Sequence, residues 1–61
     1  MDGHAYVAIK DGVCVAIFGD TPNVATAETA RKMILDGCYL DRVPIAIARK
    51  ALFQSWPMDG L

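Results

Sequence analysis

Few side chains in this 61-residue chain could do chemistry, because it holds one histidine, one serine and one glutamate. Catalysis needs an acid, a base or a nucleophile positioned beside a partner group. Ser55 has no base near it in the sequence, and His4 lies close to the N-terminus. We interpret Ser55 as a solvated residue at a helix end and His4 as a free imidazole.

The two cysteines, Cys14 and Cys38, form no CxxC pair and no Cys/His spacing suited to zinc. A Cys14–His4 pair across a hairpin would combine a nucleophile with a base. However, a turn at Asp11-Gly12 places His4 nearly opposite Gly19, several residues from Cys14. We expect reduced, buried thiols. The alternative is a disulfide that closes a loop of roughly 25 residues and contributes about 3 kcal/mol.

The aspartates do not suggest a metal site. Asp20 and Asp41 are isolated, and the other four each precede a glycine, which is ordinary turn chemistry. The stretch FGDTPN has one glycine and does not resemble a phosphate-binding loop. The sequence thus predicts no catalytic residue, no metal and no cofactor, and we expect a protein that is not an enzyme.

Basic residues are the remaining charged candidates. If two predicted helices lay side by side, their cations could form one nucleic-acid-binding patch beside Tyr39 or Trp56. The alternative, which we favour, is two solvated helix faces, because the net charge of −1 gives no strong field for nucleic acid. The residues of the candidate basic patch are Arg31, Lys32, Arg42, Arg49 and Lys50.

Length and composition predict one small domain over residues 1–61, with 57–61 as a loose tail. A chain of this size buries only about 60% of its unfolded surface. Yet 54% of its residues are hydrophobic, and the mean hydropathy is +0.30. No apolar run reaches the roughly 18 residues of a membrane span, and no signal-peptide pattern opens the chain. We therefore expect a cytoplasmic protein that shares surplus apolar surface with a partner.

The stretch YVAIKDGVCVAIFGD, residues 6–20, predicts a β-hairpin, because β-branched residues flank an Asp-Gly pair suited to a type I′ turn. Strict alternation from that turn pairs Lys10 with Val13, Ile9 with Cys14, Ala8 with Val15, Val7 with Ala16, and Tyr6 with Ile17. One face then holds Ala5, Val7, Ile9, Cys14, Ala16 and Phe18, and we expect it to meet the helices. The other face holds Tyr6, Ala8, Lys10, Val13, Val15 and Ile17.

The rest of the chain predicts a helix, a short strand and a second helix. The first helix covers Ala27 to Leu35, with Thr21 or Thr26 as N-cap and Gly37 as the C′ residue. Its apolar stripe is Ala27, Ala30 and Ile34, with Met33 beside it. Residues 39–43 predict a third strand, with a plain loop as the alternative. The second helix runs from about Pro44 to Ser55, and we expect Trp56 to pack in the core.

These elements predict an α+β fold: a small antiparallel sheet with two helices on one face, in the order β-β-α-β-α. Such a fold leaves the second hairpin face open. We therefore expect a protein–protein interaction module that binds a second copy or another protein. Small proteins of this size include phage- or mobile-element-encoded inhibitors of host proteins. The expected interface residues are Tyr6, Val13, Val15 and Ile17. A nucleic-acid-associated regulator that uses the basic residues is the alternative.

Overall fold

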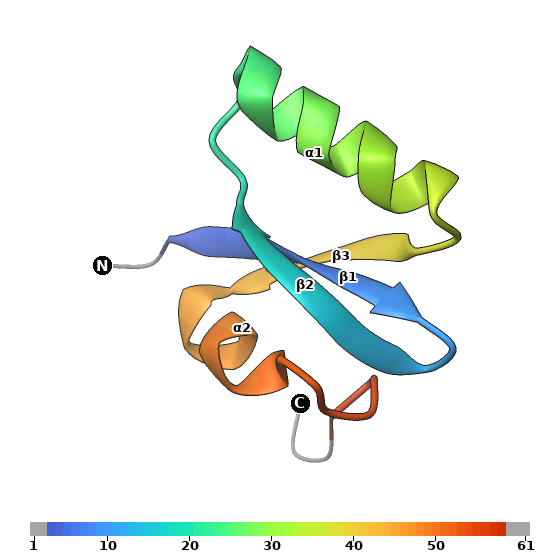
Figure 1. The fold of residues 1–61 in the computed structure, drawn as a ribbon. Helices are drawn as coiled ribbons and strands as arrows, with labels where there is room; N and C mark the ends of the chain where they lie inside the picture. The colour runs from blue at the N-terminus through green and yellow to red at the C-terminus, as the bar shows by residue number, and fades with distance from the viewer. Residues whose placement is uncertain (1–2, 59–61) are drawn as a thin grey trace.

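The computed structural model describes residues 3–58 and has the predicted α+β fold, in the order β-β-α-β-α (Figure 1). The strands pair antiparallel in the order β2-β1-β3, so β1 is central. The predicted third strand is confirmed. The elements are β1 (His4–Lys10), β2 (Val13–Gly19), α1 (Val24–Leu35), β3 (Tyr39–Pro44) and α2 (Ile45–Ala51).

The hairpin turn forms where the Asp-Gly pair predicts it. Asp11 and Gly12 have φ angles of 54° and 78°, the two positive values that a type I′ turn requires. The predicted pairs nearest the turn, Lys10 with Val13 and Ile9 with Cys14, are confirmed.

Beyond Cys14 the predicted register is wrong, because a β-bulge inserts Val15 as an extra residue in β2. Ala8 pairs with Ala16 and Val7 with Ile17. Compared with strict alternation, a bulge of one residue places every later side chain of that strand on the opposite face of the sheet. Both faces of this hairpin are apolar, so the hydrophobic pattern does not distinguish the bulged register from the regular one.

The two helices lie on opposite sides of the sheet, so the expectation that both pack on one face is wrong (Figure 1). α2 contributes Ala48 and Ala51 to the main core, whereas α1 contributes no buried residue. On the α1 side, Ala8 is fully buried. The core on the α2 side consists of Ala5, Val7, Ile9, Cys14, Val43, Ala48, Ala51 and Trp56.

Local hydrogen bonds fix both ends of α1. Asn23 is the N-cap, because its side chain accepts from the N–H of Thr26 at 2.8 Å; the predicted caps, Thr21 and Thr26, are wrong. At the other end Gly37 has φ of 94°, as a C′ residue requires. The N–H groups of Gly37 and Cys38 donate to the carbonyls of Ile34 and Met33, which completes a Schellman motif.

α2 is shorter than predicted, because the chain turns at Phe53 and returns along β2. Phe53 has φ of 63°, and residues 53–56, here called the strap, pair with the start of β2. Phe53 and Trp56 donate N–H bonds of 2.8 Å to the carbonyls of Cys14 and Gly12. These bonds satisfy an open strand edge, which further helical turns would leave unpaired.

The strap places Trp56 in the core, which confirms its predicted packing role. Met58 is half-buried and packs against the same core, so the expected loose tail does not begin at residue 57. Residues 59–61 of that tail lie outside the described residues.

Candidate interaction surface

The four residues predicted to form an interface do not share one face of the hairpin. Tyr6 and Val13 lie on the α1 side and are half-buried. Val15, the bulged residue, is exposed. Ile17 lies opposite Val7 and packs against the α2 core, so its assignment to the face of Tyr6 is wrong. The bulge is the cause, because it exchanges Ile17 for Phe18 on the Tyr6 face.

Phe18 is therefore the residue that sequence reasoning missed. It lies directly opposite Tyr6, and the two ring centroids are 5.3 Å apart with an interplanar angle of 34°. Such cross-strand aromatic pairs stabilise a sheet by a fraction of a kcal/mol to about 1 kcal/mol. Arg42 lies opposite Tyr6 on its other side, so Phe18, Tyr6 and Arg42 form one row across the three strands. We call this the aromatic row.

An ion pair lies beside the aromatic row. Nε of Arg42 donates a 2.7 Å hydrogen bond to Oδ2 of Asp20, which follows β2. The pair joins the segment after β2 to β3 across the central strand, but its arginine is largely exposed, so its contribution to stability is small.

α1 carries three large apolar side chains that are mostly exposed. Val24, Ile34 and Leu35 are 74%, 57% and 80% exposed. The side of α1 toward the sheet is instead half-buried, so the predicted stripe of Ala27, Ala30 and Ile34 is only partly right. The half-buried residues of α1 are Thr26, Thr29, Ala30 and Met33.

A second exposed apolar group lies where the strap begins. Leu52 and Phe53 are exposed, and the N–H bond from Phe53 to the carbonyl of Cys14 places them beside the bulged Val15. A bulky residue with positive φ is strained by roughly 1–2 kcal/mol, since its Cβ crowds the backbone. The bulge at Val15 and the turn at Phe53 thus both place exposed apolar side chains in the same region of the surface.

The candidate basic residues do not gather into one patch. Arg31 and Lys32 lie on α1, whereas Arg49 and Lys50 lie on α2, on the opposite side of the sheet (Figure 1). Arg42 is paired with Asp20. The geometry on which a single nucleic-acid patch depends, helices side by side, is not the geometry of this fold.

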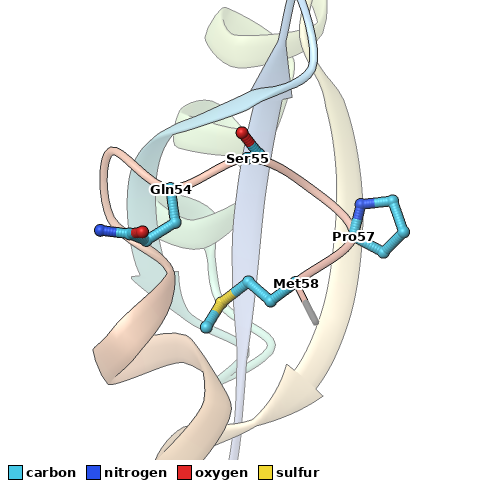
Figure 2. Close-up of a pocket in the computed structure, with 4 residues that line it drawn as sticks. All are labelled: Gln54, Ser55, Pro57 and Met58. Carbon is cyan, nitrogen blue, oxygen red and sulfur yellow. The ribbon is translucent and has the colours of Figure 1, made fainter. Parts of the chain in front are cut away.

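The structure gives no support to a catalytic grouping around Ser55. A hollow of about 380 Å³ is lined by Gln54, Ser55, Pro57 and Met58 (Figure 2). The four side chains point in different directions from the strap and the two residues after it, and none of them is an acid or a base. Among residues 3–58, no three His, Cys, Asp or Glu side chains lie close enough together to hold a metal ion.

The cysteines and His4 are also kept apart. His4 lies opposite Pro44, five residues along β1 from the partner of Cys14. Cys14 and Cys38 are both free and buried. Burial raises the pKa of the Cys14 thiol above its ordinary value of 9.0, against the opposing effect of hydrogen bonds with backbone groups of Ala16 and Ala8. A thiol of this kind is protonated and shielded near neutral pH, which disfavours nucleophilic chemistry.

Membrane insertion through a helix has no candidate in this structure. Within residues 3–58, neither helix combines the length and hydropathy that crossing a bilayer requires.

Comparison with known proteins gives one partial similarity. No protein-family model and no solved structure matches the chain. A protein described as a probable malate:quinone oxidoreductase, from Synechococcus sp. strain RCC307, is 36% identical over 62 aligned positions. The alignment covers 97% of this chain but 13% of that protein. The similarity therefore concerns a short stretch of a much longer polypeptide.

Proposed function

We propose that this chain is a non-enzymatic protein–protein interaction module whose exposed apolar side chains are covered by another polypeptide. The observation that carries the proposal is the orientation of α1, which buries no residue and directs Val24, Ile34 and Leu35 outward. Burying apolar area contributes about 25 cal/mol per Å². Docking these exposed side chains against another polypeptide would therefore add to the stability of the helix.

The partial similarity bears on the kind of partner to expect. In the Synechococcus protein the aligned stretch is joined to a much longer chain, so a larger polypeptide is one partner that the proposal allows. A module of this kind would act by contact with a larger protein or with a second copy. The malate:quinone oxidoreductase activity named for that relative belongs to the whole protein, of which this chain corresponds to 13%.

The experiment compares capture by three versions of the immobilised chain from an extract of the cells that express it. The wild type is compared with a Val24→Gln/Leu35→Gln variant and with an Arg31→Gln/Lys32→Gln variant. The control carries the same number of substitutions on the same exposed helix, and circular dichroism establishes that all three are folded. We expect a polypeptide retained by the wild type and the control, and reduced at least about tenfold with the apolar variant.

Two results would contradict the proposal. One is retention that does not distinguish the apolar variant from the wild type. The other is retained nucleic acid whose binding weakens steeply with salt and is lost with the Arg31→Gln/Lys32→Gln variant. The second result would establish the nucleic-acid regulator instead.

A further inference from the structure

The outer edge of β2 is half covered. The strap pairs with it at Gly12–Cys14, and Cys14 uses both its N–H and its C=O in that pairing. Within residues 3–58, no strand pairs with this edge beyond Cys14. β2 is the strand nearest the viewer in Figure 1, and neither helix crosses in front of it.

The bulge determines which backbone groups remain open. Along an antiparallel strand, residues alternate between bonding to one neighbour and to the other. The backbone N–H and C=O of Cys14 point away from β1, toward the strap. The extra residue Val15 then shifts by one the alternation of the backbone groups that follow. The outward residues after the bulge are therefore Ile17 and Gly19, while Phe18 between them faces β1.

Natural edge strands are protected by charged side chains, by proline, by β-bulges or by a covering segment. Here the strap and the bulge at Val15 protect the end of β2 near the hairpin turn, and the rest of the edge lacks the first two devices. The sequence of β2, VCVAIFG, has neither a charge nor a proline. The opposite edge strand, β3, carries Asp41, Arg42 and Pro44. The free part of β2 is thus the better template for an added strand, and its lack of charge permits an identical strand.

We propose that two copies of this chain pair antiparallel through the free edges of β2, about a two-fold axis at Phe18. The inference goes beyond the proposed function, because it concerns the β2 edge and leaves the exposed side chains of α1 free to contact another polypeptide. In this register Ile17 and Gly19 of one copy each exchange two backbone hydrogen bonds with Gly19 and Ile17 of the other. The two Phe18 side chains face one another at the centre, in a non-hydrogen-bonded pair whose Cα atoms lie about 4.5 Å apart.

The aromatic row makes this register self-complementary. Tyr6 and Phe18 already lie opposite each other, and the two-fold axis continues them into a row of four rings across a six-stranded sheet. No like charges meet, because Ala16 faces the Asp20 of the other copy. The pairing buries an apolar ring that is half-exposed in the single chain.

The first test uses the native chain. Light scattering after size-exclusion chromatography should give about twice the 6.6 kDa monomer mass at high concentration, falling toward the monomer on dilution. Amide exchange at Ile17 and Gly19 should slow at least about tenfold with increasing concentration. The amide of Cys14, which bonds to the strap within one chain, should be independent of concentration.

The second test introduces charge at the axis. Phe18→Lys and Phe18→Glu should each give monomers, and mixing them in equal amounts should restore a dimer, since opposite charges then meet. Tyr39→Lys is the matched control, because Tyr39 is an exposed aromatic residue on β3, the opposite edge strand. That variant should dimerise like the wild type. Restored mass in the mixture also shows that both variants are folded.

The outcomes separate this inference from the proposed function. A chain that is monomeric at every concentration, with unchanged exchange at Ile17 and Gly19, overturns the β2 pairing, whereas the capture experiment independently decides the interaction function. A dimer that persists in Phe18→Lys, with those amides still exchanging freely, also overturns the β2 pairing but supports the interaction function.

Discussion

The indole Nε1 of Trp56 donates a 3.0 Å hydrogen bond to Oδ2 of Asp41, which joins the strap at one edge of the sheet to the strand at the other. The strap follows β2 through backbone bonds, and the Trp56 side chain reaches into the core on the α2 side. This contact therefore links the two edges of a three-stranded sheet that packs against only two short helices.

We predict strong energetic coupling between Trp56 and Asp41. Hydrogen bonds to charged groups contribute about 1.5–3 kcal/mol, and removing one partner leaves a half-buried carboxylate unpaired. In a double-mutant cycle with Trp56→Phe and Asp41→Ala, the two costs should differ from additivity by at least about 1 kcal/mol. Urea unfolding followed by far-ultraviolet circular dichroism measures all four proteins. Additive costs would mean that the bond contributes nothing in solution.

The β-bulge predicts that Val15 and Ile17 respond differently to the same substitution. Val15→Asn should change the free energy of unfolding by less than about 0.5 kcal/mol, because its side chain is exposed. Ile17→Asn should cost about 2 kcal/mol, because it places an amide against the core. Strict alternation would put both residues on one face, so similar costs would contradict the bulged register.

The N-cap of α1 can be tested with a matched pair of substitutions. Asn23→Ala removes the side-chain acceptor of the Thr26 N–H and should cost about 1 kcal/mol. Thr21→Ala, at the position that the sequence also offers as a cap, should change the free energy of unfolding by less than about 0.5 kcal/mol. Amide exchange over the first turn of α1 should accelerate in the first variant alone. Equal effects of the two substitutions would place the cap elsewhere.

Features that depend on local chemistry were predictable from the sequence. The Asp-Gly turn, the left-handed Gly37 and the third strand each follow from a few neighbouring residues. The side of the sheet that each helix covers was not predictable in the same way. Both hairpin faces are apolar, so hydrophobic pattern favours neither face and tolerates a shift of register at Val15.

The candidate interaction surface was predicted less well, for two physical reasons. The bulge moved Ile17 to the core and brought Phe18 beside Tyr6, and nothing in the alternation of β2 signals the extra residue. The strap replaced the last turn of a helix that residues 44–55 favour locally, because backbone pairing with β2 and burial of Trp56 outweigh helix propensity. Both are tertiary effects that single-sequence patterns do not contain.

Burial of the Cys14 thiol predicts a dependence of stability on alkaline pH. The pKa of the Cys14 thiol is raised in the folded protein, so the folded thiol stays protonated above pH 9.0. In the unfolded chain the same thiol has its ordinary pKa of 9.0 and ionises above that pH. The unfolded state then binds fewer protons, so the free energy of unfolding falls as the pH rises above that value. At lower pH the protonated Cys14 thiol makes its full contribution to stability. One titrating group changes the free energy of unfolding by at most about 1.4 kcal/mol per pH unit.

Urea unfolding of the wild type and of Cys14→Ala between neutral and alkaline pH isolates this contribution. Other titrating groups act in both proteins, so the difference in unfolding free energy reports on Cys14. We expect the wild type to be more stable at neutral pH, since the substitution leaves a cavity in the core, and its advantage to shrink above the ordinary thiol pKa. A gap between the two proteins that stays constant or widens with pH would show that the folded thiol ionises at least as readily as an exposed one.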